Sequence, residues 1–154
     1  MNRRKMFIGV AVGAGVIAVA VFLAVTQRAP QPRGLKPNFA VGCAIDDLVV
    51  ECVQGAKLVI ELAPNGYEHF AAVMVHPSGT EQWIYPRAEG GSSLDLRSVA
   101  SNGVVNDAIK LDGPPGEYLV KGVFSHTSID RAAAKEAMAQ ADSFEASTVK
   151  VNLP

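Results

Sequence analysis

Residues 57–85 read KLVIELAPNGYEHFAAVMVHPSGTEQWIY, and this stretch decides the fold. It contains compact apolar runs that are separated by clusters of turn-forming residues. The runs cover residues 57–62, 70–75 and 81–85, and the turns are Pro64-Asn65-Gly66 and Pro77-Ser78-Gly79. Short apolar runs bounded by Gly, Pro and Asn are typical of β-strands joined by tight turns. The stretch therefore predicts consecutive strands.

The same pattern continues toward the carboxyl end. Residues 104–111 and 117–125 are further strand candidates, joined by the turn-forming segment DGPPG. Residues 149–153 (VKVNL) alternate apolar and polar side chains with a period of two, as a half-buried strand does. Short strands at this spacing predict a mainly β domain, either a sandwich or a small barrel.

One helix is expected between the last two strands. Residues 131–141 read RAAAKEAMAQA and are rich in the best helix formers. Thr127 is the expected cap, and Asp130 three residues later completes a variant capping box. Because the apolar side of this helix is mostly alanine, the helix must lie close against a sheet.

An unbroken apolar run, MFIGVAVGAGVIAVAVFLAV, covers residues 6–25. A helix of this length is about 30 Å long, which is the thickness of the hydrocarbon core of a bilayer. A short basic head at residues 1–5 precedes the run, so we expect a signal-anchor that exports the chain after it. Residues 26–38 then form a Pro-rich linker, and residues 39–154 form the exported domain.

Two alternatives at this end stay open. Ala18-Val19-Ala20 fits the small-x-small rule for signal cleavage but lies inside the apolar run, so an uncleaved anchor is favoured. Gly9 and Gly13 have the G-x-x-x-G spacing that lets two membrane helices pack closely, which allows a homodimer through these glycines. The other interpretation is that Gly is common in membrane helices.

The charge of the chain is uneven. No acid precedes Asn38, whereas the part from Asn38 onward holds all fifteen carboxylates against eight Lys or Arg residues. The net charge of this part is therefore near −7. An acidic domain repels phosphate backbones, so we expect no nucleic-acid partner.

Cys43 and Cys52 are the only cysteines. A four-residue connection over residues 46–49 would place them opposite each other in a hairpin, close to disulfide reach. An oxidising compartment would then close the bridge. The alternatives are two buried free thiols or a redox pair, although the spacing lacks the C-x-x-C geometry of thiol exchange.

Trp83, Tyr85 and Arg87 are the candidate residues for binding a partner or ligand. On a regular strand their side chains point the same way, and aromatic rings beside an arginine suit a carbohydrate, a peptide or a protein surface. The other interpretation places Trp83 and Tyr85 in the core, with Arg87 at its edge.

No catalytic motif is recognisable in the chain. There is no nucleophile elbow, Walker loop, dinucleotide fingerprint or H-E-x-x-H. The positions of His69 and His76 differ by an odd number, so on one strand their side chains point to opposite faces and do not share a metal. His126 lies at the helix entrance. We therefore expect no enzyme activity, no cofactor and no metal.

Residues 111–120, LDGPPGEYLV, resemble a motif of extracellular β-sandwiches of the immunoglobulin-like and transthyretin-like kinds. In that motif a Pro-Gly turn, here Pro115 and Gly116, precedes a strand with a tyrosine, here Tyr118. The resemblance implies an immunoglobulin-like sandwich in which Tyr118 packs at a sheet corner and bonds its hydroxyl to nearby backbone. The domain also resembles envelope-anchored domains of Gram-negative bacteria that carry a W-x-Y-P strand, here at residues 83–86.

Together these features predict an immunoglobulin-like β-sandwich with one late α-helix, preceded by a single N-terminal transmembrane helix. We expect a single-pass protein of the bacterial inner membrane with its C-terminal domain in the periplasm. The expected function is a non-enzymatic interaction module, a subunit or accessory of an envelope protein assembly. The alternative is a glycan-binding or small-ligand-binding domain that uses the strand of Trp83 and Tyr85.

Overall fold

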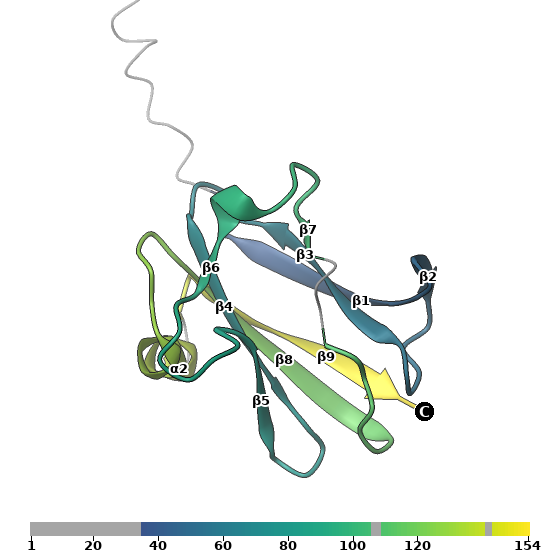
Figure 1. Ribbon diagram of the computed structural model, residues 1–154. Coiled ribbons are helices and arrows are strands. Elements are labelled where there is room, and N and C mark those ends of the chain that lie inside the picture. The colour runs from purple at the N-terminus through teal and green to yellow at the C-terminus, as the bar shows by residue number, and fades with distance from the viewer. Residues whose placement is uncertain (1–34, 106–108, 141–142) are drawn as a thin grey trace, which may run out of the picture. The chain divides into compact units, whose positions relative to one another are not determined.

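A computed structural model describes residues 35–105, 109–140 and 143–154 of the chain (Figure 1). The predicted membrane helix at residues 6–25, its basic head and the Gly9/Gly13 pair lie outside the described residues. Among the residues that are described, no helix is long and apolar enough to cross a membrane.

The described strands form two antiparallel sheets, as the sequence predicts. The first sheet has the order β2-β1-β3-β7, with bounds Leu48–Val50, Asn38–Ile45, Lys57–Ala63 and Val104–Val105. The second sheet has the order β5-β4-β8-β9, with bounds Glu81–Tyr85, His69–Val75, Gly116–Ser125 and Ala146–Leu153. A short strand, β6 (Leu94–Asp95), also pairs with β4. The expected strands at residues 57–62, 70–75, 81–85, 117–125 and 149–153 are confirmed.

The two sheets pack against one another around a single core that draws on both of them. Phe39 of β1 meets Phe70 of β4 edge-on, with ring centroids 5.4 Å apart. Gly122 of β8 lies beneath this pair, and a Cβ atom there would lie 2.6 Å from the Phe39 ring and 2.8 Å from the Phe70 ring. Any side chain at this position would displace the aromatic contact that joins the sheets.

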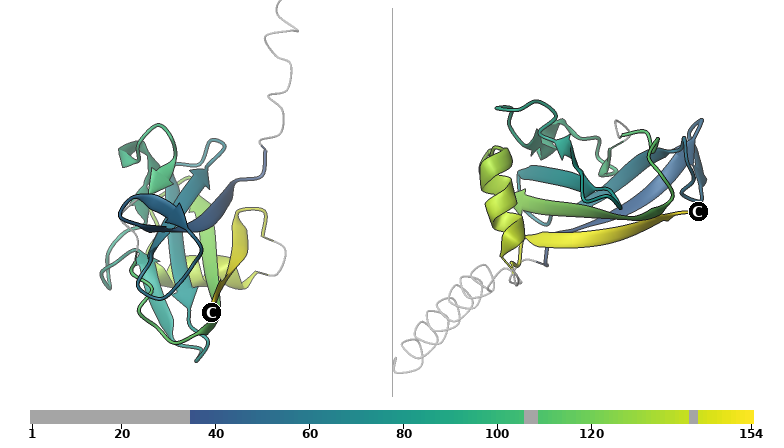
Figure 2. Two further views of the ribbon diagram at one scale, coloured as in Figure 1. Left: turned by 90° about the vertical axis from the view of Figure 1, so that its right-hand side faces the viewer. Right: turned by 90° about the horizontal axis from the view of Figure 1, so that it is seen from below.

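The α-helix of the described part, α2 (Arg131–Ala139), lies against the second sheet (Figure 2). Ala134 is fully buried and packs with Ala71 of β4 and Val123 of β8, so the alanine side does lie close to the strands. The cap differs from the prediction. Asp130 caps the helix by accepting a hydrogen bond from the Ala133 N–H at 2.8 Å, because the chain is still extended before Asp130.

The expected strand at residues 104–111 is described only in part. Val104 and Val105 form a strand, β7, which pairs with Glu61 and Ile60 of β3. Lys110 forms a separate bridge with Lys57, and residues 106–108 lie outside the described residues. Both described parts of the run therefore pair with β3.

Candidate interaction surface

The outer face of the first sheet is built from small and branched apolar residues. Phe39, Val41 and Cys43 of β1 turn toward the core, so Ala40, Gly42 and Ala44 lie on the outer side. The same alternation on β3 buries Leu58, Ile60 and Leu62 and leaves its other residues outward. The outward residues of the two strands lie opposite one another as Ala40–Glu61, Gly42–Val59 and Ala44–Lys57.

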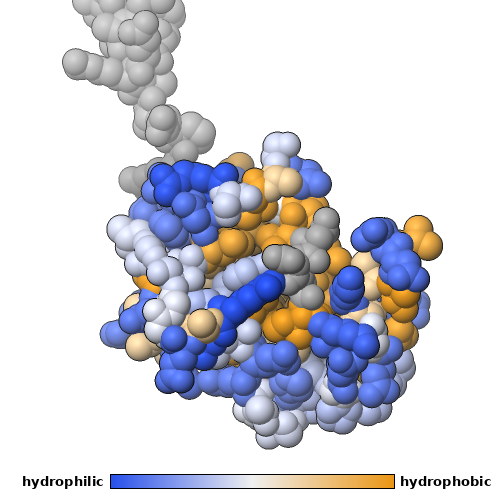
Figure 3. Space-filling view, in the orientation of Figure 1, coloured by the Kyte–Doolittle hydropathy of each residue, from blue (hydrophilic) through white to orange (hydrophobic). Residues whose placement is uncertain are grey.

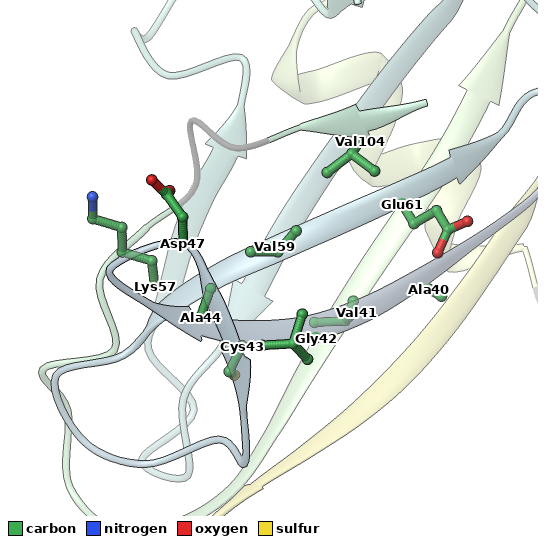
Figure 4. Close-up of a pocket in the computed structure, with 11 residues that line it drawn as sticks. Ala40, Val41, Gly42, Cys43, Ala44, Asp47, Lys57, Val59, Glu61 and Val104 are labelled. Carbon is green, nitrogen blue, oxygen red and sulfur yellow. The ribbon is translucent and has the colours of Figure 1, made fainter. Parts of the chain in front are cut away.

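A hollow of about 580 Å³ lies on this face, as Figure 4 shows. Its charged residues are Asp47, Lys57 and Glu61, and the rest of its lining is Ala40, Val41, Gly42, Cys43, Ala44, Val49, Val59 and Val104. The hollow forms because the outward side chains of β1 are smaller than those of the strands on either side, β2 and β3. In the space-filling view, apolar surface gathers near β3 and β7 and again at the β2 end of the molecule (Figure 3).

One wall of the hollow is the hairpin of β1 and β2, which exposes aliphatic side chains on both sides of its acidic turn. Leu48 is 70% exposed and Val49 is 88% exposed, and Ile45 is also open to solvent. Asp46 and Asp47 both have positive φ, at 49° and 65°, which is the conformation of a two-residue hairpin turn. Exposed large aliphatic side chains beside the turn make this tip a candidate contact surface.

The predicted disulfide between Cys43 and Cys52 is confirmed, with a Cα–Cα distance of 5.1 Å. The predicted pairing is corrected. Cys43 lies opposite Val50 rather than Cys52, because the turn has two residues instead of four. Cys52 therefore lies just beyond β2. The Cys43 side chain is buried, so the bridge fastens the hairpin from the core side and leaves the outer side open.

The expectation that Trp83, Tyr85 and Arg87 share one face is wrong for the two aromatic residues. Trp83 lies opposite Val73 of β4, but Tyr85 lies opposite the adjacent Ala72, so β5 contains a bulge. As a result Tyr85 joins the core between the sheets, while Trp83 joins the cluster under the helix. Arg87 lies over the Tyr85 ring, with its Cζ atom 5.6 Å from the ring centroid.

The exposed side of Trp83 is occupied by the start of the helix. The Arg131 guanidinium lies over the indole, with its Cζ atom 5.5 Å from the ring centroid. Arg131 Nε also donates to the Pro86 carbonyl at 3.1 Å, and a second guanidinium nitrogen donates to the Arg87 carbonyl. These bonds tie the helix to the end of β5 and cover the indole that a glycan would need.

The Pro115-Gly116-Tyr118 motif holds a corner of the second sheet. Tyr118 is fully buried, and its hydroxyl donates to the Pro114 carbonyl at 2.7 Å, as the resemblance implies. Burial raises the pKa of Tyr118 above its ordinary value. Gly113 passes so close that a Cβ atom there would lie 2.2 Å from the hydroxyl. The motif is therefore structural, and its polar group is already paired.

A second hollow, of about 340 Å³, lies between β8, the helix and the segment that leads into β9. Tyr67 stacks on His126 there, with ring centroids 4.2 Å apart. Glu145 accepts hydrogen bonds from the hydroxyls of Tyr67, at 3.4 Å, and Ser143, at 3.1 Å. Burial, followed by the nearby Glu145 charge, raises the pKa of Tyr67. The side chains of Tyr67, Ser143 and Glu145 are thus bonded to one another.

No group of three metal-ligating side chains comes together in the part of the chain that the structure describes. Each histidine there contacts a different part of the fold. His76 bonds Gln82, His126 stacks on Tyr67, and His69 lies on β4 opposite Asp95.

The hollow of the first sheet was not anticipated from the sequence. The signal that could have revealed it is the period-two pattern of Phe39, Val41 and Cys43, which marks residues 38–45 as a strand with a small-residue outer side. No family model matches the chain, and no curated protein or solved structure shows significant similarity to it.

Proposed function

We propose that this protein is a non-enzymatic interaction module that is tethered to the bacterial inner membrane and works in a protein assembly of the envelope. In this proposal residues 6–25 anchor the chain, residues 26–38 space the domain from the bilayer, and the domain lies in the periplasm. The outer face of the first sheet is the docking surface.

The observation that carries the proposal is the uncovered apolar hollow beside an exposed aliphatic tip. Leu48 and Val49 at the tip are among the most exposed large apolar residues of the described chain. Exposed aliphatic side chains beside an apolar hollow form a surface that a protein partner can cover.

Two further features support the location. The Cys43–Cys52 disulfide is expected to persist only in an oxidising compartment, which agrees with export. The acidic charge of the domain favours a protein partner over a phosphate-rich one. The paired sheets and the buried Tyr118 corner support an immunoglobulin-like relationship, which we include in the proposal.

The test compares the full chain with two arginine variants after extraction from membranes in a mild detergent. Val59→Arg places a charge in the hollow, whereas Thr148→Arg places it on the outer side of β9 in the other sheet. We expect the unchanged chain and Thr148→Arg to migrate in a complex larger than one chain. Val59→Arg should migrate as a single chain in its micelle, with unchanged thermal unfolding.

A complex that survives Val59→Arg would remove this face from the proposal. Failure of the unchanged chain to form any complex in several mild detergents would overturn the interaction function itself. A reporter fused to the carboxyl end and active only in the cytosol would overturn the location.

A further inference from the structure

We infer that the docking surface binds a second copy of this chain, face to face, around a two-fold axis that crosses β3 at Val59. This inference rests on the proposed function and names its partner. The observation behind it is the register of β1, β2 and β3, which makes the surface complementary to itself.

The charges on β3 are arranged symmetrically about Val59. Lys57, Val59 and Glu61 all lie on the outer face, and successive outward residues of a strand are about 6.6 Å apart. A two-fold axis in the plane of the interface, perpendicular to β3 at Val59, reverses the strand direction of the second copy. Lys57 of each copy then lies opposite Glu61 of the other, and the two Val59 side chains meet at the axis.

Neither charged side chain is satisfied within one chain. Among the described residues, no ion pair involves Lys57 or Glu61, although both are exposed. Two charged residues of the other sheet do form pairs, Glu117 with Lys150 at 3.4 Å and Glu81 with Lys135 of the helix at 3.0 Å. The second copy supplies an opposite charge for both residues at once.

The residues of β1 are also arranged symmetrically about this axis. Gly42 lies opposite Val59 in the register, while Ala40 lies opposite Glu61 and Ala44 lies opposite Lys57. The axis therefore places Gly42 against Gly42 of the second copy and Ala40 against its Ala44. These small side chains leave room for the sheets to approach to about 10 Å, the usual spacing of packed sheets.

The exposed tip completes the fit. Val49 lies opposite Ala44 and rises as a wall at one end of the hollow. β2 has only three residues, so no equivalent wall stands beside Ala40 at the other end. The two-fold axis carries Val49 of the second copy to that open place. Val49 of each copy thus fills the open place beside Ala40 of the other copy, as an isologous interface requires.

The expected interface is small. A face of three strands and five residues per strand covers roughly 250 Å² from each copy, well below the roughly 800 Å² per partner of standard stable complexes. Two copies held in one membrane meet at a much higher effective concentration than free domains do. We therefore expect the full chain to associate in the membrane or in a shared mild-detergent micelle, and domains that are free in solution to associate little.

Cross-linking of the full chain in membranes tests the inference. Val59→Cys puts a thiol at the axis, and a short bis-maleimide reacts with it but not with the Cys43–Cys52 disulfide. We expect a cross-linked species of twice the mass of the chain. Thr148→Cys is the matched control on the other sheet and should give at least about tenfold less of it. Equal cross-linking of the two variants, or none by Val59→Cys, would overturn the inference.

Charge reversal in the Val59→Cys background separates a second copy from any other partner. Lys57→Glu sets like charges opposite each other at both ends of the axis and should reduce the dimer about tenfold. Adding Glu61→Lys restores opposite charges only if both come from copies of this chain, so the double variant should recover the dimer. If the double variant does not recover the dimer while its thermal unfolding is unchanged, the inference that the partner is a second copy is overturned. A complex that still depends on Val59 would leave the proposed function in place.

Discussion

The outer faces of the two sheets have similar composition but different surroundings. On the second sheet, Ala71 and Val123 are fully or almost fully buried because Ala134 of the helix packs over them. On the first sheet, Ala40 and Val49 lie in the open. Both faces are apolar, so local composition alone does not tell which face is free to bind a partner.

The difference follows from the connections between strands. The helix lies between β8 and β9, which are neighbours in the same sheet, so the chain that leaves β8 and returns as β9 stays on that sheet. β1, β2 and β3 are instead joined by a two-residue turn and a short disulfide-closed loop. These connections are too short to cover the first sheet, and no described element packs over its outer face.

Introducing a charge should have opposite consequences on the two faces, and this is the largest effect that we expect. Ala134→Glu forces a carboxylate into the contact between the helix and the second sheet, which should cost about 3 kcal/mol or more. Ala40→Glu adds the same group to the open face and should change stability by about 0.5 kcal/mol or less. Urea unfolding of the full chain, followed by the fluorescence of the single tryptophan, measures both.

Equal losses of stability in these two variants would contradict the difference between the covered face and the open face. Equal losses would mean that the first sheet is covered by a part of the assembly that remains bound during the measurement. A small loss in both would mean that the helix is readily displaced from the second sheet.

The disulfide should matter next, because it fastens the wall of the open face. Closing a loop of this length stabilises the fold by about 2.5–3 kcal/mol in the chain-entropy view, so Cys43→Ala/Cys52→Ala should lose that amount. Hydrogen exchange should rise first in β2, while β8 remains protected. Reduction of the unchanged chain should reproduce the loss, and an equally stable double variant would contradict a structural role for the bridge.

Trp83 tests how much the contact between the helix and the second sheet contributes to stability. Trp83→Ala removes an indole that packs under the helix and beneath Arg131, and it should cost about 2 kcal/mol, since the ring is only partly buried. Circular dichroism during heating provides the measurement. Trp83→Phe keeps an aromatic ring and should lose about half as much. An unchanged melting temperature together with a loss of glycan binding would instead favour the ligand-binding alternative.

The smallest effect on stability is expected at the open tip. Val49→Ser should change the free energy of unfolding by about 0.5 kcal/mol or less, because the side chain is already in water. The same variant should weaken the proposed pair, in which the tip would fill a gap in the second copy. Comparing thermal unfolding with cross-linking yield separates the two effects. A loss of stability above about 1 kcal/mol would show that Val49 packs within its own domain.

Several features could be predicted from local sequence because their causes are local. The alternation of Val149, Val151 and Leu153 identifies the inward side of β9, and all three do pack against the core. The alanine-rich helix forms where its residues favour it. The pairing of Cys43 with Cys52 also follows from the sequence, since only two cysteines are present and a short chain segment joins them.

The candidate site could not be predicted, because its determinants lie in pairings between distant residues. One extra residue in β5 separates Trp83 from Tyr85, and only the match with Val73 and Ala72 of β4 reveals the bulge. The hollow depends on β1 having small residues where β3 has Lys57 and Glu61.

The sequence by itself therefore determined the strands, the late helix and the disulfide, because hydrophobic period, helix propensity and loop closure act over a few residues. Only the tertiary structure decided which apolar face lies under the helix and which remains open. That choice depends on which strands become neighbours. The alternation of apolar and polar residues shows which side of a strand is buried, but it does not show which strand pairs with it.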